Sequence, residues 1–112
     1  MGAEALILHA GAYSEAGDRQ EGLRLAATSI IEALERCGEG LPVYVENVPG
    51  GGRRLGGTLE DVAFLIESVQ RAGRPCGTCI DTAHAWAAGF EIASAAGMLG
   101  FVAGLSLSLI HI

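Results

Sequence analysis

Three short apolar runs alternate with longer amphipathic stretches along this chain. Residues 5–9 (ALILH), 41–46 (LPVYVE) and 76–81 (CGTCID) are dominated by apolar and β-forming residues, and each run ends in a polar side chain. Continuous apolar runs of this kind are typical of buried parallel strands, whose two faces are both covered. We therefore predict three strands, with a helical stretch after each.

Amphipathic helices are predicted after the first two strands. Asp18 and Thr58 stand where N-caps are expected, each with an acidic residue three positions further on, as in a capping box. Apolar residues then recur at three- and four-residue steps, so each helix has one apolar stripe. The stripes are Leu23, Ala27, Ile30, Ile31 and Leu34 on the first helix, and Val62, Leu65, Ile66 and Val69 on the second. Gly38 is expected to end the first helix, and Gly73 with Pro75 the second.

The third strand leads into a compact segment, TAHAWAAG, in which Trp86 and Phe90 are expected to be core residues. The run from Ile92 to the last residue is apolar and uncharged, but its glycines and serines make it a poor membrane-spanning helix, so no insertion is expected. The predicted strands end at residues 9, 46 and 81, a nearly constant spacing. This alternation predicts right-handed βαβ units and an α/β fold, as an open sheet or as part of a barrel.

Polar side chains end all three predicted strands. His9, Glu46 and Asp81 occupy these ends, and His84 follows Asp81 by one helical turn. The C-terminal ends of parallel strands lie on one face, so these side chains are expected to converge there. Mixed imidazole and carboxylate donors suit Zn²⁺ or Mn²⁺. Helix capping is the alternative role for any one position, such as Asp81, but three polar strand ends in register favour a metal site.

Two further patterns bear on chemistry. Cys76 and Cys79 have the CxxC spacing of zinc and redox sites, but residues three apart on a strand point to opposite faces, which favours buried structural cysteines. The GGGRR stretch follows Glu46 and therefore lies on the same face as the predicted ligands. Its glycines permit close backbone approach, and Arg53 and Arg54 supply positive charge for a phosphate. A flexible surface loop is the alternative interpretation.

Composition limits the setting and the partners. The chain is 50% hydrophobic and 18% charged, which is typical of a globular domain. A net charge of −6 argues against nucleic acid as a partner, although a metal site can supply positive charge locally. Three cysteines cannot all pair with one another, and no signal peptide is recognisable. We therefore expect a reducing, cytoplasmic setting, a monomer, and neither membrane nor protein partners.

The stretches LHAG, VENVPGGGRRLGGTLEDVAFLI and CIDTAHAWAAGF together resemble endonuclease IV, a family of metal-dependent apurinic/apyrimidinic endonucleases with a TIM-barrel fold. The resemblance runs from Met1 to about Gly97. It implies a partial (β/α)₈ barrel of about three consecutive β/α units. It also implies hydrolysis of the phosphodiester bond 5′ to abasic sites in double-stranded DNA, with three zinc ions as cofactors and manganese as the alternative metal.

The resemblance also implies individual roles. His9 would bind the first metal, and Glu46 would bridge the first and second metals and act in catalysis. Asp81 would bind the second metal and His84 the third, while the GGGRR loop would approach the DNA backbone. One departure is Ala10, which stands where the family motif H-P-G has proline. The family's remaining ligands fall outside the matched stretch, so we expect the chain alone to be inactive.

The last six residues, LSLIHI, are expected to be foreign to the protein. His111 mimics a downstream histidine of the family, but it follows His84 too soon, by about two helical turns. LSLIHI is also the translation of CTG TCT CTT ATA CAC ATC, which looks like the mosaic-end adapter of transposase-based sequencing libraries. We therefore expect residues 1–106 to be a central fragment of a barrel domain and residues 107–112 to be an adapter-derived tail.

Two other functions fit parts of the pattern. A sugar isomerase or epimerase on the same kind of barrel would also place carboxylate and histidine ligands at its strand ends. A non-catalytic metal-binding module would need only the ligands. The stretches GGGRRLGG and DTAHAWAAG favour the nuclease over both.

Overall fold

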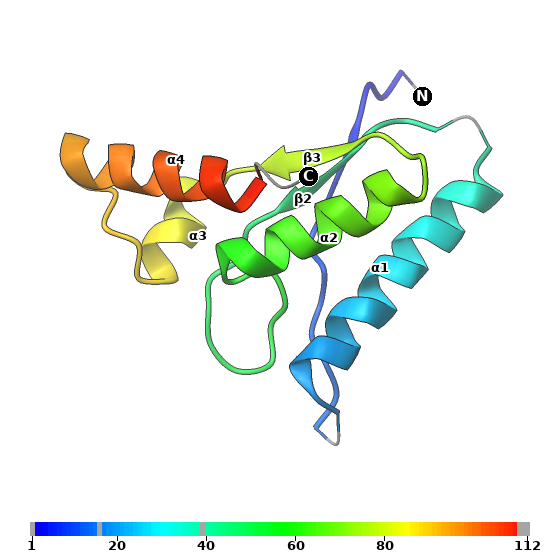
Figure 1. The fold of residues 1–112 in the computed structure, drawn as a ribbon, viewed down its shortest axis with the longest axis horizontal. Coiled ribbons are helices and arrows are strands. Elements are labelled where there is room, and N and C mark those ends of the chain that lie inside the picture. The colour runs from blue at the N-terminus through cyan, green and yellow to red at the C-terminus, as the bar shows by residue number, and fades with distance from the viewer. Residues whose placement is uncertain (1, 16, 39, 110–112) are drawn as a thin grey trace.

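The computed structural model describes residues 2–15, 17–38 and 40–109. Its elements are β1 (Leu6–Leu8), α1 (Arg19–Arg36), β2 (Val43–Glu46), α2 (Leu59–Arg71), β3 (Cys76–Cys79), α3 (Thr82–Ala87) and α4 (Ala95–Leu109). The strands form one parallel sheet in the order β1-β2-β3. In Figure 1, α1 and α2 lie against one face of the sheet, and α3 and α4 lie beyond the end of β3. The predicted α/β fold with consecutive parallel β/α units is confirmed.

Side-chain caps begin the two long helices where the sequence predicts them. The Asp18 carboxylate accepts a hydrogen bond from the Glu21 N–H at 2.9 Å, and the Thr58 hydroxyl accepts one from the Asp61 N–H at 3.2 Å. Each bond satisfies a backbone donor that the first turn of a helix leaves unpaired. Gly38, with φ at +77°, follows the C-cap of α1 and ends that helix as predicted.

The main core lies between the sheet and these two helices. Val43 and Val45 project from β2 toward the helices and are at most 1% exposed. Both predicted stripes pack there, and burying each aliphatic side chain contributes about 1.5–3 kcal/mol. The buried stripe residues are Leu23, Ala27 and Leu34 on α1 and Val62, Leu65, Ile66 and Val69 on α2, with Ile30 and Ile31 partly buried beside them. This layer holds the strand ends at a fixed position.

The other face of the sheet is more open. Ile7 and Tyr44 are neighbours in register on β1 and β2 and point away from the helices. Their exposed fractions are 58% and 37%. The candidate site lies at the C-terminal edge of this open face.

Helix α4 was not predicted from the sequence. Its residues are apolar on nearly every side, so the sequence lacks the alternation of apolar and polar positions by which a helix is recognised. Phe101 is buried against Leu59 and Ala85, and its ring meets that of Phe90 edge-on with the centroids 4.9 Å apart. The Ser94 hydroxyl accepts a hydrogen bond from the Gly97 N–H at 3.0 Å at the start of the helix. Within the described part of the chain, no helix is long and apolar enough to span a membrane.

Two predictions for this end of the chain have different outcomes. Phe90 packs in the cluster around Phe101, as expected for a core residue. The same prediction for Trp86 was wrong, because the short helix α3 buries Ala85 and leaves the Trp86 side chain 58% exposed. His111 lies outside the described residues, and the division proposed at residue 106 stays a prediction.

Candidate metal centre

Three of the four predicted ligands meet at the C-terminal edge of the sheet. His9 follows β1 directly, Glu46 is the last residue of β2, and His84 lies in α3. One potential ligand atom from each of them lies within 4.8 Å of the other two. Residues far apart in the sequence are thus brought together because parallel strands end on the same side.

Glu46 stands between the two imidazole rings. Its Oε2 atom is 3.1 Å from His9 Nε2, and its Oε1 atom is 3.5 Å from His84 Nδ1. The rings themselves are edge-on, with centroids 5.6 Å apart. The Glu46 side chain is only 18% exposed, so its charge is partly withdrawn from water and needs a cationic partner. Each oxygen of one carboxylate therefore faces a different imidazole.

This arrangement fits a divalent metal. Zinc binds imidazole nitrogen and carboxylate oxygen at about 2.0–2.2 Å, so neighbouring ligand atoms on a tetrahedron are roughly 3.4 Å apart. The 3.1 Å separation of Glu46 Oε2 from His9 Nε2 is close to that value. Two nitrogen donors and one carboxylate also suit Zn²⁺ or Mn²⁺ better than Mg²⁺ or Ca²⁺, which prefer oxygen ligands.

The structure places Asp81 at the edge of this group rather than within it. Asp81 is the N-cap of α3, and its Oδ1 atom accepts a hydrogen bond from the His84 N–H at 2.8 Å. This bond lowers the pKa of the Asp81 carboxyl, and the nearby His84 ring adds to the effect. The Oδ2 atom is 3.9 Å from His84 Nδ1. Asp81 thus holds the helix that carries His84, and its own role as a ligand stays a prediction.

Asn47 is a residue of the site to which the sequence analysis gave no role. It is 5% exposed and joins the ends of β2 and β3. Its amide nitrogen donates to the Asp81 carbonyl at 3.0 Å, and its amide oxygen accepts from the Asp81 N–H at 2.7 Å. The available signal was an asparagine directly after a strand-ending ligand, where the backbone of the next strand leaves its ladder.

The backbone of Asn47 also orients one candidate ligand. His84 Nδ1 lies 2.9 Å from the Asn47 carbonyl oxygen. A carbonyl can only accept, so Nδ1 carries the hydrogen and Nε2 keeps the lone pair that a metal needs. Metal-binding histidines are commonly held through their second nitrogen in this way.

The two arginines of the glycine-rich loop, residues 47–57, face different surroundings. Arg54 lines a hollow of about 440 Å³ together with His9, and its other lining residues are Gly11, Ala12, Val48 and Pro49. Arg53 instead forms an ion pair with Glu15, with Nη1 and Oε1 3.1 Å apart. The two predicted phosphate-binding arginines therefore lie in different surroundings: Arg54 shares a hollow with the candidate ligand His9, and Arg53 is paired with the loop after β1.

The cysteines do not belong to the group of three ligands. Cys76 packs against the core on the helix side of the sheet, and burial raises the pKa of its thiol to about 11. Cys79 is in register with Glu46 and, three positions on, points to the opposite face. Both are partly buried and have no disulfide, while Cys37 is exposed. The divergence of the CxxC thiols follows the prediction.

Comparisons with known proteins give a consistent result. The family model for the xylose isomerase-like TIM barrel matches residues 1–112. A protein named probable endonuclease 4 from Nitratidesulfovibrio vulgaris (strain Hildenborough) is 43% identical over 93 residues, or 82% of this chain and 32% of that protein. One of the same name from Mycobacterium ulcerans is 32% identical over 111 residues, or 99% of this chain and 41% of that protein.

A solved structure matches in the same way. The crystal structure of endonuclease IV from Thermus thermophilus superposes with a TM-score of 0.74 and 29% identity, over 96% of this chain and 35% of that one. The chain therefore spans about a third of the length of relatives such as the Nitratidesulfovibrio protein.

Proposed function

Because the chain belongs to the endonuclease IV family of xylose isomerase-like TIM barrels, we propose that it forms part of a phosphodiesterase acting at abasic sites in double-stranded DNA. The relatives' names support a nuclease over the sugar isomerase alternative. The cytoplasmic setting and the lack of a protein partner remain predictions from the sequence.

One observation carries the proposal: the Glu46 carboxylate lies between two imidazoles, with one oxygen toward each. A carboxylate with one oxygen beside His9 and the other directed away from it suits a shared ligand, which supports the roles that the resemblance gives to His9 and Glu46. The Asn47 carbonyl holds His84 Nδ1 and leaves Nε2 for a metal, which supports the role of His84. When bound, zinc ions supply a Lewis acid for phosphate oxygens and lower the pKa of bound water toward neutrality. The chain's contribution is to hold the ligands in place, with Asp81 and Asn47 fixing the position and tautomer of His84.

The hollow beside His9 supports a place for the scissile phosphate. Arg54 lines it with a guanidinium group that suits phosphate oxygens, and the small residues Gly11 and Ala12 leave room for close approach. A phosphate held there would lie next to the metal ligands. Arg53 contributes indirectly, because its ion pair with Glu15 joins the glycine-rich loop to the loop after β1.

The proposal is tested in a chimaera in which residues 2–106 replace the matching third of the Thermus thermophilus enzyme. The host supplies the ligands that the resemblance places outside this chain. The substrate is a duplex with a single abasic site, and the product of incision 5′ to that site is measured. We expect incision that stops on chelation and returns with Zn²⁺. Replacing Glu46 by Gln should lower the rate at least about a hundredfold, whereas Glu32→Gln, an exposed carboxylate on α1, should not.

The two arginines provide a matched comparison in the same chimaera. Arg54→Gln should raise the KM for the abasic duplex about tenfold, whereas Arg53→Gln should change it less than about threefold. A chimaera that is folded by circular dichroism and binds Zn²⁺ but does not cut the duplex would contradict the proposed function. Equal effects of the two arginine variants would contradict the assignment of Arg54 alone.

A further inference from the structure

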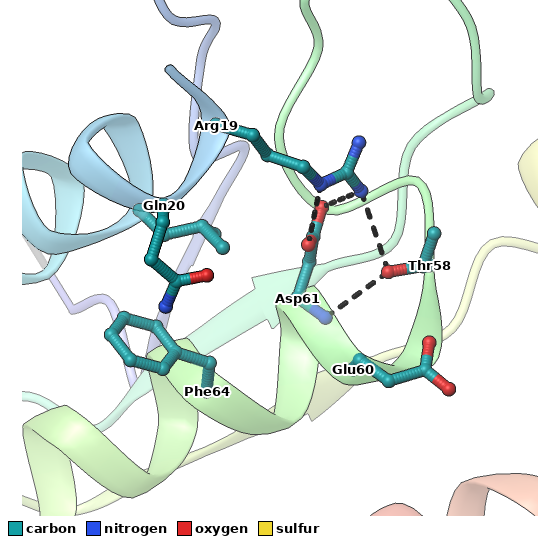
Figure 2. Close-up of a pocket in the computed structure, with 7 residues that line it drawn as sticks. Arg19, Gln20, Thr58, Glu60, Asp61 and Phe64 are labelled. Atoms are coloured by element: carbon teal, nitrogen blue, oxygen red, sulfur yellow. Dashed lines mark hydrogen bonds and ion pairs between the residues drawn. The ribbon is translucent and has the colours of Figure 1, made fainter.

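An ion pair between the partly exposed Arg19 and the buried Asp61 joins the first turns of α1 and α2. The Asp61 side chain is only 4% exposed, and its Oδ1 and Oδ2 atoms accept hydrogen bonds from Arg19 Nε and Nη2 at 3.1 and 2.5 Å. Arg19 Nη2 is also 3.5 Å from the Thr58 hydroxyl. Figure 2 shows the guanidinium lying over the carboxylate beside the start of α2. The bidentate contact fixes the orientation of the carboxylate.

The fixed carboxylate has one further partner, which belongs to the glycine-rich loop. Asp61 Oδ2 accepts a hydrogen bond from the Gly56 N–H at 2.9 Å. The Gly56 carbonyl in turn accepts from the Val48 N–H at 3.0 Å, at the other end of the loop. Gly57 touches Gly50 so closely that a Cβ atom on Gly57 would lie 2.9 Å from Gly50 Cα. The two ends of the loop therefore meet at Val48 and Gly56, which we call the neck of the loop. Asp61 is hydrogen-bonded to this neck from α2.

The returning half of the loop is aligned with the segment after β1. The Leu55 N–H donates to the Gly11 carbonyl at 2.9 Å, and the Tyr13 N–H donates to the Arg53 carbonyl at 3.1 Å. Leu55 is 1% exposed and anchors this half in the core. Arg54 lies between these anchors and faces the hollow shared with His9. Its position thus depends on how the neck of the loop is held.

We propose that the Arg19–Asp61 pair is a positioning element for the glycine-rich loop, which sets the place of Arg54 beside the candidate metal ligands. The pair touches neither His9, Glu46 nor His84, so it acts on phosphate binding through Arg54 and leaves metal binding unchanged. The effect on phosphate binding rests on the proposed function. The effect on the loop itself does not.

The test uses the 112-residue chain with Zn²⁺. Asp61→Asn removes the negative charge that faces Arg19. Arg19→Gln keeps the Asp61 carboxylate and removes the two guanidinium hydrogen bonds that orient it, at a partly exposed position that tolerates replacement. Glu67→Gln is the matched control, because Glu67 lies on the same helix and pairs with Arg71 at the surface, away from the loop. Amide exchange is followed residue by residue, and the affinity is measured for a duplex containing a stable tetrahydrofuran abasic analogue.

In both test variants we expect faster exchange at Gly56 and Val48, with the amides of Val62 to Val69 unchanged. Asp61→Asn should weaken duplex binding about tenfold in the wild-type chain but less than about twofold in an Arg54→Gln background, because the two changes remove the same interaction. The affinity for Zn²⁺ should change less than about twofold in every variant.

Three results would overturn the proposal: exchange that rises equally along α2, exchange in the loop that does not change, or losses in duplex affinity that add independently of Arg54. If the unaltered chain does not bind the duplex, the DNA-binding part of the proposed function fails. The exchange measurement then still decides whether the pair positions the loop.

Discussion

The buried Asn47 side chain connects the end of β2 to the backbone of Asp81, beside the candidate metal centre. Replacing it by Ala removes two hydrogen bonds to the Asp81 backbone, at 3.0 and 2.7 Å. Each such bond contributes about 0.5–1.5 kcal/mol net, and the partly exposed position of Asp81 lets water replace part of the loss. We therefore expect Asn47→Ala to lower the free energy of unfolding by about 2 kcal/mol.

The same substitution should also weaken metal binding. Without the Asn47 side chain, the Asp81 backbone loses its anchor to β2, so the start of α3 is less firmly held and His84 shifts relative to the Asn47 carbonyl that orients its ring. Residues that orient metal ligands typically change metal affinity by roughly 10–100-fold, and we expect a loss in that range. The Zn²⁺ affinity and the free energy of unfolding would both be measured in the chimaera, by competition with a chromogenic chelator and by urea titration.

Thr78→Val is the matched control, because the Thr78 hydroxyl also bridges β2 and β3 through a hydrogen bond to the Val45 carbonyl at 3.1 Å. It should cost about 1 kcal/mol of stability and leave Zn²⁺ affinity unchanged. If Asn47→Ala and Thr78→Val lowered Zn²⁺ affinity equally, or if neither did, the role of Asn47 in orienting His84 would be refuted.

Three further predictions concern the core and the cysteines. Leu65→Ala, at a fully buried position on α2, should lower the free energy of unfolding of the chimaera by about 2–5 kcal/mol in urea titration, and a loss below about 1 kcal/mol would contradict the packing described. With iodoacetamide at pH 8, exposed Cys37 should react fastest and Cys76 slowest, as read by mass spectrometry. Burial raises the pKa of the Cys76 thiol from its ordinary 9.0 to about 11. The folded protein therefore keeps the thiol proton more tightly than the unfolded chain does, and the resulting contribution to the free energy of unfolding is complete below pH 9 and lost as the pH rises toward 11. A denaturation midpoint that did not fall between these pH values, relative to Cys76→Ala, would count against that burial.

Local patterns were enough to predict most of the fold. Three features follow from rules that act within a few residues or between neighbouring strands: the stripes of α1 and α2, their caps at Asp18 and Thr58, and the parallel direction of the strands. Helix α4 was missed because an unbroken apolar run has no period to read. Trp86 was misplaced because its exposure depends on which side of a short helix meets α4, which spacing alone does not determine.

The convergence of three candidate ligands was predictable from the sequence, but the contacts that support them were not. His9, Glu46 and His84 converge because parallel strands end together, and this much follows from the sequence. The position of Asp81 as a cap beside the group, and the part played by Asn47, depend on hydrogen bonds across 34 residues of sequence. The different surroundings of Arg53 and Arg54 likewise depend on where Glu15 and the hollow lie in the fold.

The most direct test of the metal centre is a calorimetric titration of the 112-residue chain with Zn²⁺, alongside Glu46→Gln and Glu32→Gln variants. We expect saturable binding by the unaltered chain and by Glu32→Gln, and an affinity at least about tenfold lower in Glu46→Gln. The Glu46 carboxylate lies between the His9 and His84 rings, so removing its charge should lower Zn²⁺ affinity more than removing the charge of an exposed carboxylate. Equal affinities in all three proteins would contradict a metal centre at these residues.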